Sequence, residues 1–186
     1  MNGFQTFIGV EDFKTVEILR NLFGEFLGTF LYVFVGVMST VSLSKSLITS
    51  VIPVAFAFGL SLSTVSHVVQ RASGAHLNPA ISISSMNDPT RNDLNLSGPL
   101  VVGLSVASGH LVGYLLSSSS MNPARSFGPA LVNLDFKYHW IYWIGPILGG
   151  VLGAIYYAFG MQDREALKRY YSRRNVSRKS SIRSIT

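Results

Sequence analysis

The chain has 186 residues, of which 48% are hydrophobic and 13% are charged, and its mean hydropathy is positive. Soluble domains usually contain about 25% charged residues, so this composition indicates a membrane protein. The chain contains no cysteine, which excludes disulfides, thiol catalysis and cysteine-ligated metals. Its net charge of +6 is concentrated in residues 161–186, where eight Lys or Arg accompany two Asp or Glu. A basic tail can bind nucleic acid, but one that follows an apolar span is more typical of cytoplasm beside anionic lipid.

Four apolar runs are long enough to cross a bilayer, whose hydrocarbon core requires about 20 residues of helix. We expect these spans at about 22–43, 47–69, 98–116 and 140–159. They follow a polar, weakly amphipathic segment at 1–21, whose charged residues do not resemble a cleavable signal peptide. The sequence therefore predicts an all-α membrane protein with a basic tail at 161–186.

The first predicted span contains an acid, Glu25. A carboxylate inside a membrane is costly and normally has a partner. We expect a structural role for this residue, as a buried carboxylate that accepts hydrogen bonds from nearby backbone or loop groups. A role in transport is the alternative.

A short motif follows an apolar run at two places: Asn78, Pro79 and Ala80, and again Asn122, Pro123 and Ala124. Asn is a good helix N-cap and Pro is favoured at the first helical position, so each motif predicts the start of a helix. We expect short helices at about 78–86 and 122–132. The first is too short to span a membrane and fits a half-helix that enters and stops.

The two motifs belong to a longer repeat. Their asparagines are 44 residues apart, and Gly59-Leu60-Ser61 and Gly103-Leu104-Ser105 each precede the next motif asparagine by 19 residues. The block of apolar span, small-residue turn and motif thus occurs twice without a gap. Internal repeats in an apolar chain indicate a transporter or channel built from two related halves.

The distribution of Lys and Arg predicts the orientation of the chain. A cytoplasmic basic tail and four spans place both termini inside, with Arg71 and Arg91 inside and Lys45 and Lys137 outside. The polar stretch 86–97 is then a cytoplasmic loop. The two half-helices enter from opposite sides and can meet near the midplane.

Two half-helix N-termini that meet in a membrane would bring two positive dipole ends together, which opposes cations and protons. The side-chain amides of Asn78 and Asn122 can donate to a passing oxygen, and Arg125 adds a permanent cation with further donors. A snorkelling surface arginine is the alternative for Arg125. Apolar walls with a few aligned donors suit a small neutral molecule in single file.

These residues resemble the aquaporins, the major intrinsic protein family. The resemblance is carried by Gly24-Glu25-Phe26-Leu27-Gly28-Thr29-Phe30, Ser73-Gly74-Ala75-His76-Leu77-Asn78-Pro79-Ala80, Gly109-His110, Met121-Asn122-Pro123-Ala124-Arg125-Ser126-Phe127-Gly128-Pro129-Ala130 and His139-Trp140-Ile141-Tyr142-Trp143-Ile144-Gly145-Pro146. It implies an aquaporin-like inverted repeat with two re-entrant half-helices.

The resemblance also implies an aromatic and arginine constriction, which counting from the motifs places at Phe58, His110, Ser119 and Arg125. A bulky Phe with His resembles the narrow, water-selective members. Glycerol channels of the family usually carry Gly in place of that His, and Asp where Ser126 follows the arginine here. The implied function is passive transmembrane water transport with exclusion of cations and protons.

The chain departs from the family in its number of spans. The family has six, and the resemblance assigns the four predicted spans to its first, second, fifth and sixth, with the junction near Ile83–Met86. The chain then corresponds to a splice variant or fragment that is truncated to four transmembrane helices. Removing two consecutive spans preserves the topology but removes part of the pore wall and part of the family's tetramer contacts.

Three functions remain open at this point. The first is a water channel, which could assemble as a homotetramer. The second is a non-conducting shortened isoform that associates with full-length channels. The third, a glycerol or other small-solute channel, would require a wider constriction. An enzyme is not expected, because no nucleophile–base pair, metal cluster or phosphate loop is present. We expect neither a metal nor another cofactor, and no nucleic-acid partner.

The expected location is the plasma membrane, as a multi-pass protein in contact with the lipid bilayer. The tail places Ser177, Ser180 and Ser181 after basic residues, as basophilic kinases require. An unmodified disordered tail is the alternative interpretation.

Overall fold

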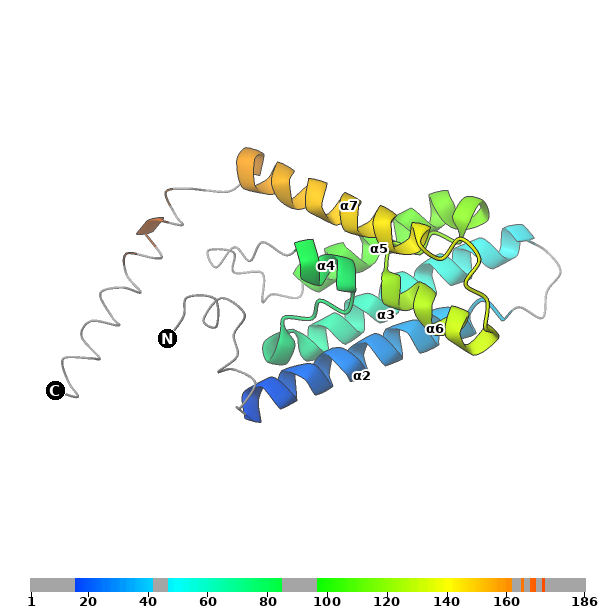
Figure 1. The fold of residues 1–186 in the computed structure, drawn as a ribbon, viewed down its shortest axis with the longest axis horizontal. Helices are drawn as coiled ribbons and strands as arrows, with labels where there is room; N and C mark the ends of the chain where they lie inside the picture. The colour runs from blue at the N-terminus through cyan, green and yellow to red at the C-terminus, as the bar shows by residue number, and fades with distance from the viewer. Residues whose placement is uncertain are drawn as a thin grey trace.

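The computed structural model describes residues 16–41, 47–84 and 97–161, together with Glu165, Lys168, Arg169 and Ser172. Within these residues all regular structure is helical (Figure 1). Several sequence predictions lie outside the described residues: the segment 1–15, the loop 86–96, and the residues Lys45, Arg91, Ser177, Ser180 and Ser181.

The described residues contain four helices that are long and apolar enough to cross a membrane. They are α2 (Val16–Met38), α3 (Leu47–Ser73), α5 (Ser97–Ser117) and α7 (Ile141–Tyr156), which continues into the π-helical turn η2 (Tyr157–Met161). Two shorter helices, α4 (Pro79–Ser84) and α6 (Pro123–Asn133), begin at the two Asn-Pro-Ala motifs. The elements therefore follow the predicted order.

The largest boundary difference is at α2, which covers residues 16–38 where the sequence predicts 22–43. Its first turns accommodate charge because Glu17 and Arg20 form an exposed ion pair one turn apart, at 3.7 Å. Its C-terminal end is closed by hydroxyls, since Ser39 Oγ and Thr40 Oγ1 donate to carbonyls of the last turn at 2.6 and 2.7 Å. The polar residues that seemed to precede the span thus belong to the helix.

The helices α3 and α5 form the centre of the bundle and cross where each has a glycine. A Cβ atom on Gly59 would lie 2.5 Å from the carbonyl oxygen of Gly103, and a Cβ on Gly103 would likewise collide with the oxygen of Gly59. The contact is reciprocal, and the two glycines are 44 residues apart, in the register of the sequence repeat. Small residues allow membrane helices to approach this closely.

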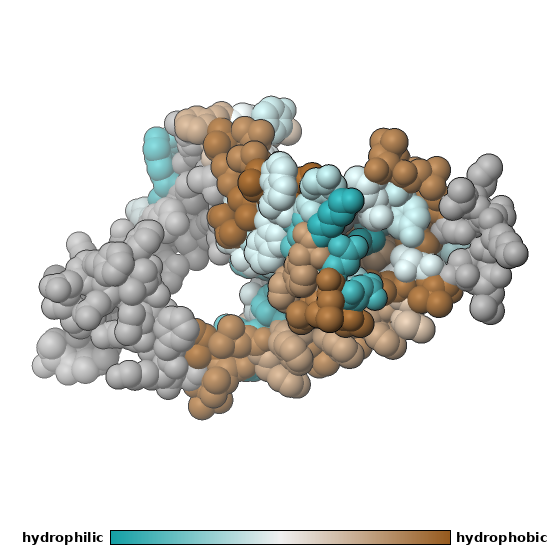
Figure 2. Space-filling view, turned by 45° about the vertical axis from the view of Figure 1, so that its right-hand side comes forward, coloured by the Kyte–Doolittle hydropathy of each residue, from teal (hydrophilic) through white to brown (hydrophobic). Residues whose placement is uncertain are grey.

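The other two long helices cover this centre from different sides (Figure 1). α2 packs along α3, where its Gly28 and Gly36 accommodate Leu77 and Phe58 of the core. α7 instead packs on α4, and none of its residues is buried. Apolar side chains cover much of the coloured surface in Figure 2, with hydrophilic ones gathered near its middle. Such a surface suits helices surrounded by lipid.

Candidate functional site

Each short helix begins with an asparagine that caps its first turn. Asn78 Oδ1 accepts a hydrogen bond from Ala80 N at 2.9 Å, and Asn122 Oδ1 accepts one from Ala124 N at 2.9 Å. Asn122 Oδ1 also accepts from Arg125 N at 3.4 Å. These bonds satisfy backbone donors that a helix N-terminus otherwise leaves without partners.

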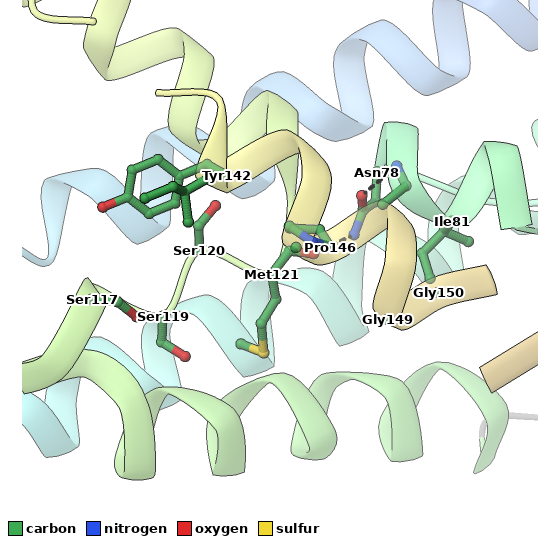
Figure 3. Close-up of a pocket in the computed structure, with 13 residues that line it drawn as sticks. Asn78, Ile81, Ser117, Ser119, Ser120, Met121, Tyr142, Pro146, Gly149 and Gly150 are labelled. Atoms are coloured by element: carbon green, nitrogen blue, oxygen red, sulfur yellow. Dashed lines mark hydrogen bonds between the residues drawn. The ribbon is translucent and has the colours of Figure 1, made fainter. Parts of the chain in front are cut away.

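The same two asparagines tie the half-helices to each other. Asn78 Nδ2 donates to the carbonyl oxygen of Met121 at 3.0 Å (Figure 3), and Asn122 Nδ2 donates to that of Leu77 at 2.8 Å. Leu77 and Met121 are again 44 residues apart, so the bonds are equivalent under the repeat. The sequence predicted that the two helix starts meet, but it did not identify these two carbonyls as the acceptors.

The loops before the motifs share an unusual backbone conformation. Positive φ angles occur in the first loop at Ala75 (55°) and Leu77 (49°), and in the second at their 44-residue equivalents Ser119 (44°) and Met121 (52°). Residues other than glycine rarely adopt this region. Both loops adopt this conformation at equivalent positions. The last of these residues in each loop, Leu77 or Met121, has the carbonyl that accepts a hydrogen bond from the asparagine of the other motif. The repeat register identifies Leu77 and Met121 as equivalent positions, although it does not show what their carbonyls bind.

Glu25 supports the first of these loops. Its carboxylate oxygens accept hydrogen bonds from His76 N at 2.9 Å and Leu77 N at 2.7 Å. These bonds are of the kind that the sequence predicts for a structural carboxylate at this position. The expected burial is only partial, because Glu25 lines an open groove beside α2 and is half-buried. Its carboxylate thus fixes the loop that presents Leu77 to Asn122.

We expect Glu25→Gln to loosen this loop. A carboxamide offers one acceptor oxygen in place of two, so one backbone N–H loses its partner at a cost of about 1–2 kcal/mol. Amide hydrogen exchange should accelerate at residues 76 and 77, and the thermal midpoint in detergent should fall. Glu17→Gln, which changes an exposed acid in the same helix, is the control. Unchanged exchange at residues 76 and 77 would contradict this role.

Three of the predicted constriction residues contact each other. The rings of Phe58 and His110 stack with centroids 4.5 Å apart and planes 17° from parallel. The guanidinium carbon of Arg125 lies 4.7 Å from the centre of the Phe58 ring. The fourth residue, Ser119, turns its hydroxyl to the carbonyl oxygen of Gly109 at 2.7 Å, one residue before His110. The sequence therefore identified a cluster that the fold brings together.

This cluster is closed in the isolated chain. Phe58 and His110 are both 0% exposed, so a water molecule cannot touch either ring. Tyr32 packs edge-on against Phe58 from α2, and Tyr114 lies beyond His110 on α5. No motif or spacing in the sequence indicated these two tyrosines. They extend the ring stack from α2 across α3 to α5.

Hydrogen bonds to the preceding loop hold Arg125 in place. Its Nη2 donates to the carbonyl oxygen of Ser118 at 3.1 Å, and the residue is only 9% exposed. Ser120 Oγ donates to Asn122 O at 2.8 Å and also forms a hydrogen bond with the Ser126 hydroxyl. Arg125 is therefore a buried cation and not a snorkelling surface residue.

Two openings adjoin the meeting point of the half-helices. A groove of about 1310 Å³ runs along α2 and reaches Asn78, Pro79, Ala124 and Arg125. A smaller opening of about 480 Å³ lies between the loop 117–121, α4 and α7 (Figure 3). Within the described residues, no three His, Asp or Glu side chains gather closely enough to hold a metal ion. The polar groups at this site are mainly hydrogen-bond donors and backbone carbonyls.

The family model "Major intrinsic protein" matches residues 12–87 and 82–157 of the chain. Individual relatives include the "Lens fiber major intrinsic protein" of Lithobates pipiens, 28% identical over 80% of this chain and 83% of the relative. The protein of the same name from Homo sapiens is 29% identical over the same shares. "Aquaporin-1" of Homo sapiens is 27% identical over 83% of this chain and 87% of the relative.

The alignments contain more positions than the chain supplies residues. The comparison with the Lithobates protein runs over 220 residues, whereas 80% of the 186-residue chain is about 149 residues, so about 71 positions face a gap in this chain. The two segments matched by the family model meet at residues 82–87. Because those segments together cover most of the sequence, the chain belongs to the major intrinsic protein family of membrane channels, which are not enzymes.

Proposed function

We propose that this chain is a water channel of the aquaporin type, which carries passive water flow and excludes cations and protons. The observation that carries this proposal is the crossed asparagine pair, with Arg125 one helical turn beyond Asn122. Each asparagine amide has two N–H donors and uses one of them on a carbonyl, which leaves the second for a passing oxygen. The two helix N-termini and the arginine oppose cations.

The proposed selectivity for water rests on the constriction. Phe58 and His110 are bulky, and Arg125 closes a third side, so an opening between them would be narrow. Glycerol needs a wider passage, which makes a glycerol channel the less favoured alternative. Water is small enough to accept hydrogen bonds from the arginine and from the asparagine amides in single file.

The proposed topology is that of an inverted repeat with re-entrant half-helices. The first residues of α2 and the last residues of α7 lie at the same end of the bundle (Figure 1), as four spans with both termini in the cytoplasm require. The half-helices α4 and α6 then approach the midplane from opposite sides. A plasma-membrane location is part of this proposal.

The proposal includes the loss of the family's third and fourth spans. Two observations support it: about 71 aligned positions have no residue in this chain, and the two matched segments meet at 82–87, beside the predicted junction at Ile83–Met86. A splice variant or an incomplete gene model would both produce this arrangement.

A second candidate function is a non-conducting subunit that associates with full-length channels. It is favoured by the stack of Phe58 on His110, which leaves neither ring exposed to water, and by the open groove along α2. Apolar residues of both half-helices are also exposed, for example Ile83 at 61% and Val132 at 83%. Because the groove along α2 leaves the pore wall open, a single chain does not enclose a pore. Neighbouring subunits, for example in a homotetramer, would have to complete the wall.

The test is stopped-flow shrinkage of proteoliposomes that contain only this chain, with Arg125→Ala and Asn122→Asp as variants. Fast water flow with a low activation energy, altered in both variants, is the result expected for a channel. Glycerol flow measured on the same vesicles tests the third function. Water flow equal to that of empty vesicles, with correct insertion shown by protease protection, would support the non-conducting subunit.

A further inference from the structure

The two halves of the chain repeat their contacts as well as their helices. A Cβ on Gly59 would lie 2.7 Å from the Cβ of Ala107, and a Cβ on Gly103 would lie 2.6 Å from the Cβ of Ser63. These two contacts are related by the 44-residue register, because position 59 corresponds to 103 and position 63 to 107. The helices α3 and α5 are therefore equivalent, and the surroundings of one can be compared with those of the other.

The helix α5 lacks the neighbour that its equivalent α3 has. α2 packs along α3, where its Gly36 lies against the ring of Phe58, and that ring is completely buried. The residue of α5 that corresponds to Phe58 is Val102, which is 52% exposed. Within the described residues, α5 packs against α3 and against no other helix. One face of α5 is thus open at the place where α2 lies in the first half.

The loop before the second motif has two backbone N–H groups without an acceptor. In the first half, the carboxylate of Glu25 accepts hydrogen bonds from the N–H groups of His76 and Leu77. The corresponding N–H groups are those of Ser120 and Met121, and neither has an acceptor within the described residues. Ser120 is only 4% exposed, and buried backbone donors are nearly always paired. The second half therefore lacks both a counterpart of α2 and a counterpart of its carboxylate.

The same loop favours protein over lipid as the neighbour of α5. Its backbone is irregular, with positive φ angles at Ser118, Ser119 and Met121. Irregular backbone at membrane depth is tolerated only where protein buries it or where it lines a water-filled cavity. Lipid chains provide no acceptor for its N–H groups, whereas an apolar helix with an acidic side chain provides both cover and an acceptor.

The comparisons indicate where such a helix would lie in a sequence. α2 precedes α3, so its counterpart would precede α5, which begins at residue 97. About 71 positions of the Lithobates relative face a gap in this chain, and the two segments matched by the family model meet at 82–87. A segment of that length can contain a membrane-spanning helix, which needs about 20 residues. The relative thus has additional residues at the point where the repeat requires the helix.

We propose that the open face of α5 and the loop 118–121 bind a transmembrane helix of a second polypeptide. This helix lies along Val102 as α2 lies along Phe58, and it carries a carboxylate that accepts from the N–H groups of Ser120 and Met121. The second polypeptide is a family member that retains the third and fourth spans. The inference rests on the proposed loss of those spans from this chain, but it does not depend on water flow.

Spin-label electron paramagnetic resonance in vesicles tests this docking, because the chain has no cysteine of its own and a single one can be introduced. Val102→Cys places the label on the open face. Val101→Cys is the matched control, since Val101 is 61% exposed and lies about 100° around the same helix. The added partner is the segment of the Lithobates relative that faces the gap, produced as a separate polypeptide. We expect the label at 102 to lose mobility and accessibility to oxygen, and the label at 101 to keep both.

Three results would overturn the proposal. An equal response at 101 and 102 would indicate nonspecific contact, and no response at either position would show that the segment does not dock. A label at 102 that is immobilised without the segment, and more so at higher protein density, would assign the face to a second copy of this chain. Water flow is measured separately on the chain alone, so a failure of the channel function is distinguishable from a failure of docking.

Amide hydrogen exchange on the unmodified chain covers the case in which the cysteine variants fail to fold. We expect exchange at residues 120 and 121 to slow when the segment is added, and exchange at 76 and 77, which Glu25 already binds, to stay unchanged. The same segment with its acids changed to the corresponding amides is the control and should slow exchange less. Unchanged exchange at 120 and 121, or equal slowing by the two segments, would contradict the carboxylate contact.

Discussion

Asn122→Ala is expected to destabilise the fold by about 2–4 kcal/mol, because one side chain makes three hydrogen bonds that methyl cannot replace. Its amide oxygen caps α6 through Ala124 N and Arg125 N, and loss of a cap costs about 1 kcal/mol. Its Nδ2 also satisfies the carbonyl oxygen of Leu77, and a buried acceptor without a partner costs a further 1–3 kcal/mol, about as much as a lost polar contact in a core.

The measurement is the thermal midpoint of the detergent-solubilised chain, which should fall by about 5–15 °C for a change of this size. Asn133→Ala is the control, because Asn133 lies exposed at the opposite end of the same helix. A midpoint within about 2 °C of the unmodified chain would show that the crossed asparagine contact contributes little.

Gly103→Val is expected to separate α3 from α5 and to cost about 3 kcal/mol or more. A side chain at this position would meet the backbone oxygen of Gly59 and the Cβ of Ser63 on the facing helix. Backbone cannot rotate away as a side chain can, so the two helices must move apart and lose their packing along the crossing.

Titration with sodium dodecyl sulfate, followed by circular dichroism, measures this effect as a lower midpoint. Gly153→Val in α7 is the matched control, since a Cβ there meets no atom of another described element within 4 Å. Similar midpoints for the two variants would show that the cost arises from valine in a membrane helix and not from the glycine contact.

The sequence predicted the repeat more successfully than it predicted the state of the constriction. The 44-residue register between Asn78 and Asn122 reappears in the glycine contact, the left-handed loop residues and the crossed hydrogen bonds. A register follows from local chemistry, because each half repeats the same small residues and the same cap. Apolar length likewise indicated the four spans.

The closed stack could not be predicted in this way. The resemblance to the aquaporins placed Phe58, His110 and Arg125 near one another but gave no distance between the rings. That distance depends on how Tyr32 packs from α2, which is a contact between distant segments. The start of α2 was also misplaced, because Glu17 and Arg20 seemed too polar for a span although they suit its first turn.

The crossed asparagine bonds also impose an order on biosynthesis. The acceptor for Asn78 is Met121, which leaves the ribosome 43 residues later. Translation proceeds at about 5–20 residues per second, so Met121 is synthesised about 2–9 s after Asn78. During that interval α4 and the preceding loop depend on the Asn78 cap, on the Glu25 bonds and on the packing of Leu77 in the core. Glu25 can thus stabilise the loop at His76 and Leu77 before the second motif, to which this loop later binds, has been synthesised.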